Sequence, residues 1–145
     1  MEKKINDDSK SQLNFVNYKI DELVFTDNEN FESEKVKIDM QFNKDIDYIE
    51  EVGSLDRVIV TLEADIFNDP IENNYPFNLY IKMTGFFELT TNDIKGKDII
   101  INRNTIAIMF PYLRSLVSTI TANSQVPPLI IPTININKLL DSEEK

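Results

Sequence analysis

Hydrophobic and polar residues alternate along much of the first part of the chain. The strictest alternation lies in residues 35–42, where Val36, Ile38, Met40 and Phe42 fall on one face of an extended chain. A period of two is typical of a β-strand with one buried face. Alternation and β-branched or aromatic residues together predict four strands, at residues 13–26, 35–42, 56–68 and 75–90.

Two of these strands are expected to be irregular. The apolar phase shifts after Ile20, which predicts a bulge or bend at Asp21 and Glu22 of the first strand. Gly85 predicts a second bulge, in the fourth strand. The polar segments 44–55 and 68–74 are interpreted as loops.

From residue 104 the spacing of apolar residues changes to three and four, which predicts one apolar stripe on a long helix. Asn102 or Asn104 is placed to cap the start of this helix. Pro111 lies inside the pattern and is expected to kink or divide the helix, because proline removes a backbone donor. The residues of the stripe are Ile106, Phe110, Leu113, Val117 and Ile120.

The end of the chain predicts an extended segment and a short second helix. Residues 127–132 are extended, with Leu129, Ile130 and Ile131 as apolar contacts. Asn135 or Asn137 caps the short helix, which carries Leu139 and Leu140. We predict a single domain at residues 13–140, flanked by a disordered N-terminal arm at 1–12 and a short acidic tail at 141–145.

Strands that precede helices predict an α+β fold, in which an antiparallel meander of four strands is covered on one face by the helix. Both faces of the first, third and fourth strands carry apolar residues, among them Ile59 and Phe86. Surplus apolar surface on a small domain favours an oligomer or a binding groove.

Composition excludes several functions. The 145 residues include no Cys and no His, so thiolate and imidazole catalysis and the usual zinc ligands are excluded, and three Gly cannot form a phosphate-binding loop. A net charge of −10 disfavours nucleic acid and anionic membranes, and it either keeps the chain soluble or attracts basic partners. We expect a cytoplasmic protein that is not an enzyme, with no cofactor and no metal. A hydrolase or isomerase that uses carboxylates or Ser-Lys chemistry is the least supported alternative.

Residues 110–140 resemble the SecB family of export chaperones. The matching elements are Phe110-Pro111-Tyr112, Arg114, Pro127, Leu129 and Asn135. The resemblance extends upstream through Phe25, residues 36–40 and Gly85-Phe86-Phe87, and so covers about residues 13–140. It implies a four-stranded antiparallel sheet with one long and one short C-terminal helix, assembled as a dimer of dimers.

The resemblance also implies a function. Such a protein is an ATP-independent holdase that binds unfolded preproteins in apolar grooves and delivers them to SecA and the Sec translocase. By position, the client groove is formed by Val36, Ile38, Met40, Ile136, Leu139 and Leu140. The alternative for residues 36–42 is an ordinary core strand. Because the family assembles through the long helix, the stripe Ile106, Phe110, Leu113, Val117 and Ile120 is expected to serve both the core and the homotetramer interface.

The chain departs from the family at several positions. Glu22 matches an acidic position of the SecA contact, but Tyr80 stands where a second carboxylate is expected, and the acidic tail is short. Pro132 falls one residue early, and Ser115 replaces an acidic residue after Arg114. Arg114 itself is expected to be structural, pairing with a carboxylate or capping a loop. These departures support a second hypothesis, a dedicated chaperone for one client such as the antitoxin of a toxin–antitoxin pair.

Overall fold

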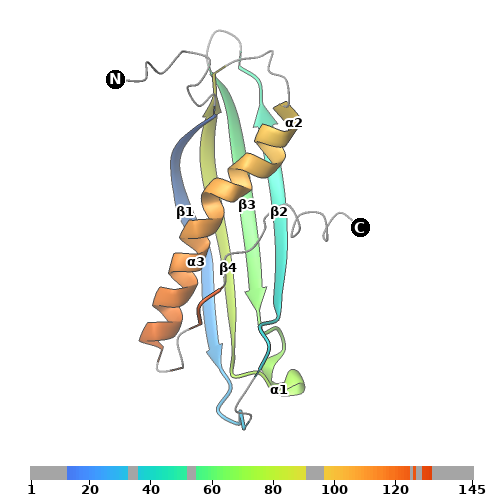
Figure 1. The fold of residues 1–145 in the computed structure, drawn as a ribbon, viewed down its shortest axis with the longest axis vertical. Helices are drawn as coiled ribbons and strands as arrows, with labels where there is room; N and C mark the ends of the chain where they lie inside the picture. Colours follow the sequence, from blue (N-terminus) through green and yellow to red (C-terminus); the bar gives the residue numbers. More distant parts are fainter. Residues whose placement is uncertain are drawn as a thin grey trace, which may run out of the picture.

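The computed structural model describes residues 13–32, 36–51, 55–90, 97–124, 126 and 129–131. In this part of the chain, one long helix crosses one face of a four-stranded sheet (Figure 1). The strands are β1 (Leu13–Asp27), β2 (Met40–Ile49), β3 (Asp56–Ile66) and β4 (Phe77–Leu89). The helical segments are α1 (Pro70–Asn73), α2 (Lys97–Ile99), the π-helical η2 (Ile100–Asn104) and α3 (Thr105–Asn123), of which the last three are continuous.

All three strand pairs are antiparallel, which confirms the predicted sheet, but the strand order is β1-β4-β3-β2. Only β2, β3 and β4 form a meander, and β1 lies beside β4, as in a Greek key. β4 pairs with β1 from Leu13 opposite Leu89 to Asp27 opposite Phe77. This register sets apolar side chains opposite one another, as at Phe15 and Phe87 or Phe25 and Leu79, and such cross-strand pairs stabilise the pairing of β1 with β4.

The second strand was placed too early in the sequence. Met40 pairs with Ile66, the last residue of β3, and the chain then turns away at Phe67 with a φ of 57°. Residues 36–39 therefore have no neighbouring strand to pair with and lie outside the sheet. The segment from residue 44, predicted as a loop, instead continues β2, with Lys44 opposite Leu62 on the helix-facing side. This lysine interrupts the apolar alternation and explains the error.

The two predicted bulges had different outcomes. The register between β1 and β4 shifts between Ile20 and Glu22, which confirms the irregularity at Asp21, and a second shift follows Phe15. The bulge predicted at Gly85 is wrong, because both neighbouring strands stay in register there. Gly85 instead permits close approach of the helix, since a Cβ at this position would lie 2.6 Å from the Sδ of Met109.

The core lies between α3 and the sheet face that α3 covers. Alternate residues of β3 and β4 face the helix and are fully buried, as predicted from their alternation. Burial of apolar area at roughly 25 cal/mol per Å² makes this layer the main source of stability. Its largest side chains are Phe87, Leu62, Ile66, Leu79, Ile81, Met83, Leu89, Ile106, Met109, Leu113 and Ile131.

The long helix begins at Lys97, before the predicted start, and neither predicted cap operates. Asn104 is itself helical, with φ −67° and ψ −35°, and makes no side-chain capping bond. The helix also runs through Pro111 without dividing. Pro111 and Ala107 are both exposed, so water can satisfy the Ala107 carbonyl that loses its donor. A kink at Pro111 stays a prediction.

By length and composition, residues Lys97–Asn123 also pass as a helix able to cross a membrane. Core helices of soluble proteins pass the same test, and 39% of the window concerned is buried within the structure. We therefore assign this helix to the core.

Two further expectations concern short segments. The loop predicted at 68–74 contains α1, a single turn with Pro70 in its first position, flanked by left-handed Asp69 and Asn74. The short helix with Leu139 and Leu140, the arm at 1–12 and the tail at 141–145 lie outside the described residues.

The start of the long helix is fastened to the end of the sheet by three side chains. Lys97 Nζ lies 4.3 Å from the ring centroid of Tyr48, and the Tyr48 hydroxyl donates to the buried carboxylate of Asp56. The backbone N–H of Glu51 donates to the same carboxylate at 3.2 Å. The bond from Tyr48 lowers the pKa of Asp56, although burial opposes the shift.

We expect Gly85→Ala to destabilise the fold by about 1–3 kcal/mol, because the new methyl group overlaps Met109 in a packed core. Urea unfolding measures the loss. In the double variant with Met109→Ala the overlap disappears, so the two substitutions should cost less together than the sum of their separate costs. A strictly additive result would contradict the contact.

We expect Asp56→Asn to make stability less sensitive to acid. A carboxyl group whose pKa is lowered in the folded state stabilises above its unfolded pKa of about 4, and this contribution is lost as the pH falls through the folded value. The difference in unfolding free energy between wild type and variant should therefore shrink from pH 6 towards pH 3, measured by urea titration. Asp45→Asn, at an exposed position of β2, is the control and should show no such trend. A constant difference for Asp56→Asn would rule out the linkage.

Candidate functional site

β1 is an edge strand with large apolar side chains exposed to solvent. Their exposed fractions run from 37% at Leu23 to 50% at Val16. An edge strand also presents one row of backbone N–H and C=O groups that the sheet itself does not pair. Because these features coincide, β1 is suited to pair with a further polypeptide strand. We call this surface the β1 edge; its exposed apolar residues are Val16, Tyr18, Ile20, Leu23 and Val24.

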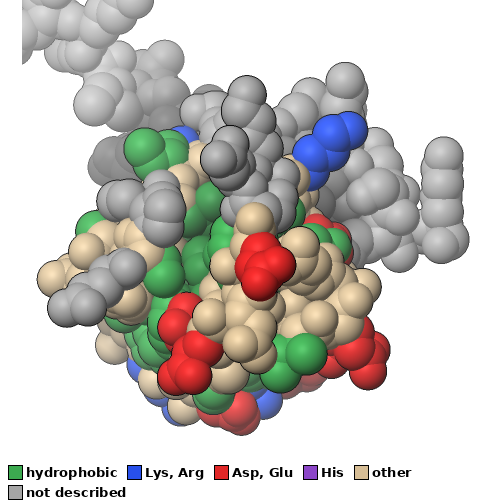
Figure 2. Space-filling model, turned by 90° about the horizontal axis from the view of Figure 1, so that it is seen from below, with side chains coloured by type: hydrophobic (Ala, Val, Ile, Leu, Met, Phe, Trp, Pro, Cys, Tyr) green, Lys and Arg blue, Asp and Glu red, His purple; other side chains and the backbone are tan. Residues whose placement is uncertain are grey.

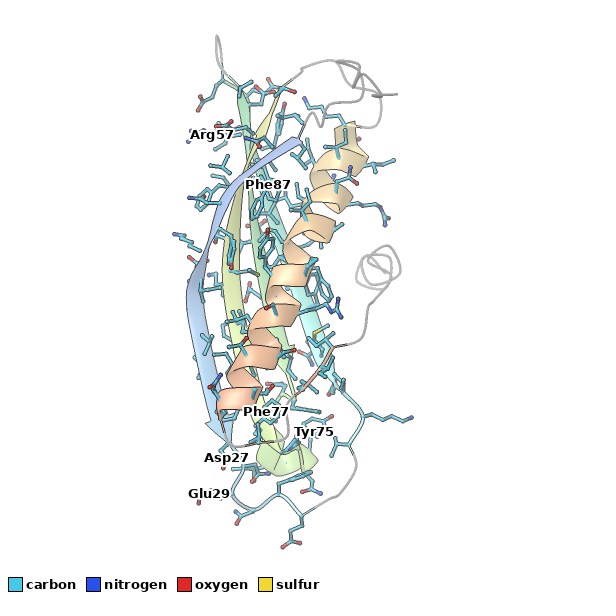
Figure 3. The ribbon with its side chains drawn as sticks, turned by 60° about the vertical axis from the view of Figure 1, so that its left-hand side comes forward. Asp27, Glu29, Arg57, Tyr75, Phe77 and Phe87 are labelled. Atoms are coloured by element: carbon cyan, nitrogen blue, oxygen red, sulfur yellow. The ribbon has the colours of Figure 1, made fainter. Side chains whose placement is uncertain are left out.

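An aromatic cluster continues the β1 edge onto the long helix. The Tyr112 ring of α3 lies 4.9 Å from Tyr18 and 5.5 Å from Phe15, measured between centroids. Phe15 packs in turn on Phe87 of the core, with 5.1 Å between the ring centroids. Phe87 is labelled in Figure 3. Tyr18 and Tyr112 are both exposed. The apolar surface therefore spans a strand and a helix that are held together by ring contacts.

Three residues of the predicted client groove are described, and they lie just before β2 and at its first residue. Val36 and Met40 pack partly against the core, whereas Ile38 is 41% exposed. Asp39 anchors the segment: its carbonyl accepts from Phe67 N at 2.8 Å, and its carboxylate accepts from the Tyr75 hydroxyl at 2.7 Å. The second wall, Ile136, Leu139 and Leu140, lies outside the described residues, so the groove as a whole stays a prediction.

The α1 end of the molecule is rigid and acidic. Asn28 is buried, and its side-chain amide donates to the carbonyls of Pro70 at 3.1 Å and Tyr75 at 2.9 Å. The ring of Phe67 lies 4.9 Å from that of Tyr75 and 5.2 Å from that of Phe77. Tyr75 and Phe77 are labelled at this end of the molecule in Figure 3. Seen from this end, hydrophobic side chains lie between acidic ones (Figure 2). The exposed acidic residues here include Asp27, Glu29, Asp39, Asp69 and Glu72.

The face of the sheet turned away from α3 is covered by no described helix (Figure 1). Tyr80 lies on this face between the buried Leu79 and Ile81, and its hydroxyl donates to Glu63 Oε2 at 2.6 Å. This bond, with burial and the charge of nearby Glu22, raises the pKa of Tyr80 to about 12. The two positions that the resemblance assigns to the motor contact, Glu22 and Tyr80, thus lie on one face and close enough to interact.

Three side chains of α3 hold residues 129–131 as an extended segment, which we call the strap (Figure 1). Leu129 N donates to Thr121 Oγ1 at 2.8 Å, and Ser118 Oγ donates to the Leu129 carbonyl at 3.2 Å. Arg114 Nε donates to the Ile131 carbonyl at 3.0 Å, in keeping with the loop-capping role expected of Arg114. Ser118 and Thr121 were missed from sequence, although they follow Arg114 by four and seven residues, a spacing that marks one polar helix face.

The stripe of the long helix belongs to the core. Ile106, Leu113 and Val117 are at most 1% exposed in the single chain, so their side chains have almost no area left for a partner. Phe110 is also buried, and Ile120 packs partly against the core. In the single chain, the stripe therefore has little exposed area with which to form the predicted oligomer interface. The sequence pattern indicated which side of the helix is apolar, but not how much of that side the chain's own sheet covers.

The family of the chain follows from comparison with known proteins. The family model described as preprotein translocase subunit SecB matches residues 14–145. The chain belongs to the SecB family. Members of this family are chaperones and not enzymes. A protein of Methanocaldococcus jannaschii described only as uncharacterized is 32% identical over 137 residues, covering 94% of this chain and 87% of that protein.

Two solved structures have the same fold. A SecB-like chaperone of Mycobacterium tuberculosis, in complex with an antitoxin peptide, has a TM-score of 0.62 at 12% identity and covers 86% of this chain and 88% of that one. A Streptococcus agalactiae protein of unknown function has a TM-score of 0.55 at 11% identity, covering 83% of this chain and 97% of that one. At these identities, the structures establish the SecB-like sheet and helix and nothing further.

Proposed function

We propose that this SecB-family protein is an ATP-independent holdase that binds unfolded segments of other proteins. The observation that carries the proposal is the segment 36–40, which is anchored at Asp39 but leaves Ile38 in solvent beyond the end of the sheet. An unfolded chain offers apolar side chains, and a surface of this kind buries them without demanding one sequence. The exposed acidic residues at the same end favour clients with basic residues nearby.

We further propose that assembly uses the β1 edge. Pairing of β1 with β1 of a second copy would satisfy its unpaired backbone and bury its exposed apolar residues together with Tyr112. A homotetramer built as a dimer of dimers is the state we expect, in the cytoplasm.

A dedicated chaperone for a single client, such as an antitoxin, is the second candidate. It is favoured by Tyr80, which replaces a carboxylate on the uncovered sheet face and binds Glu63 instead. The Mycobacterium tuberculosis neighbour holds an antitoxin peptide, which makes this client class worth testing. General export with transfer to SecA is the first candidate, supported by Glu22 on the same face.

We expect the protein to suppress aggregation of a heat-denatured enzyme without ATP, measured by light scattering. Ile38→Ser should weaken the effect about fivefold, because a half-buried isoleucine contributes about 1 kcal/mol to client binding. The matched control is Ile71→Ser, which removes another exposed isoleucine, 76% exposed on α1, and should leave suppression unchanged.

Wild-type protein that leaves aggregation unaffected would refute the holdase. A pull-down from native lysate then separates the two candidates. Recovery of many precursors with SecA supports general export, and recovery of one small unstable protein supports the dedicated chaperone.

We expect light scattering to give a mass near four times the 16.8 kDa chain. Val24→Lys places a charge on the exposed side of the β1 edge and should reduce this mass to that of a monomer at micromolar concentration. Ile71→Lys, away from β1, adds the same charge and should keep the wild-type mass. Dissociation by both variants, or by neither, would remove β1 from the interface.

A further inference from the structure

A pocket lies between α3 and the strap. It has a volume of about 250 Å³ and is lined by Pro111, Arg114, Ser115, Ser118, Ile130 and Ile131. Arg114 is the only charged residue in this lining. Among the described residues that line it, the pocket thus carries one positive charge, in a chain with a net charge of −10.

The guanidinium of Arg114 is only partly used by the fold. Its Nε donates to the Ile131 carbonyl at 3.0 Å, which fixes the plane of the group. Within the described part of the chain, its two terminal NH₂ groups have no carboxylate partner. A planar guanidinium matches a carboxylate with two parallel N–H···O bonds. The Ser115 hydroxyl lines the same pocket and supplies a further donor.

The strap also presents backbone groups on its side turned away from α3. The N–H and C=O of Leu129 both bond to α3, so in an extended chain those of Ile130 point the opposite way. Ile130 makes no hydrogen bond to any described residue, and its side chain is 71% exposed. An extended segment that binds along the strap therefore finds a backbone donor and acceptor on the outer side of the strap and an apolar contact at Ile130, while Arg114 supplies a cation on the side towards α3.

We propose that this pocket is a subsite for the carboxylate of an Asp or Glu side chain in a bound client segment. The client runs along the strap, packs an apolar residue on Ile130 and places its carboxylate between Arg114 and Ser115. The proposal rests on the holdase function. It adds that a bound client segment takes a defined position along the strap, with its carboxylate at Arg114. Because acidic groups are repelled over most of this acidic chain, one unneutralised arginine selects where an acidic client residue lies.

The test uses two fluorescently labelled nine-residue peptides with blocked ends, which alternate Leu and Ser and differ only in a central Glu or Gln. Binding to the full chain is measured by fluorescence anisotropy. We expect the Glu peptide to bind about fivefold more tightly at low salt, and the preference to fall at about 0.5 M salt, where exposed charges are screened.

Variants separate charge from strap geometry. Arg114→Gln keeps an amide donor for the Ile131 carbonyl but removes the charge, so the Glu preference should vanish while the Gln peptide still binds. Ser115→Ala touches no side-chain bond of the fold and should reduce the preference about twofold. Ser118→Ala removes the bond to the Leu129 carbonyl without changing the charge. We expect it to lower the affinities for the Glu and Gln peptides by the same factor, so that the preference for Glu is unchanged. Arg57→Gln, at the far end of the sheet and paired with Glu51 at 2.7 Å, controls for net charge and should change nothing.

Equal affinities for the two peptides in wild type, or a preference that survives Arg114→Gln, would overturn the subsite while leaving the holdase intact. Failure of both peptides to bind wild-type protein would overturn the holdase itself, and the subsite with it.

Discussion

The arrangement depends on one constraint: a four-stranded sheet has two faces and two edges, and one long helix covers a single face. The contact is close because Gly85 lacks a side chain and Met109 fills the space. Helix and sheet then bury the apolar residues of β3, β4 and α3 within the chain. What is left over, at the β1 edge and at residues 36–40, is apolar surface that no element in the described part of the chain covers.

The parts of the fold that sequence predicted are those in which one local pattern matches one buried face. In β3 and β4, alternate residues between Val58 and Ile66 and between Phe77 and Leu89 pack against the helix, as their alternation predicted. The second strand was misplaced because pairing, and not alternation, decides where a strand ends: β3 stops at Ile66, so Val36 and Ile38 have no partner strand. The strand order was missed for a related reason, since pairing between distant segments leaves no local signal.

The candidate site was predicted less well, because a pattern states which residues are apolar but not what covers them. The stripe from Ile106 to Ile120 was expected to serve both core and interface; the structure buries Ile106, Phe110, Leu113 and Val117 in the core and leaves Ile120 partly buried, and the interface role stays a prediction. Arg114 was expected either to pair with a carboxylate or to cap a loop, and its Nε bonds the Ile131 carbonyl of the strap. The partners Ser118 and Thr121 escaped notice because hydroxyl residues on a helix are common and usually bond their own backbone. Thr121 does both, donating to the Val117 carbonyl at 2.9 Å and accepting from Leu129.

The hydrogen bonds between α3 and the strap explain how the pocket and Ile130 remain exposed to a client. A strap fixed only by apolar contacts would pack its side chains inward and close over the pocket. Side chains of α3 instead bond the backbone of Leu129 and Ile131, which sets the segment at a defined distance from the helix and turns Ile130 outward. The bonds are individually modest, about 0.5–1.5 kcal/mol each. They are made to the main chain, so they hold the strap open without using the side chains and backbone groups that a client segment would contact.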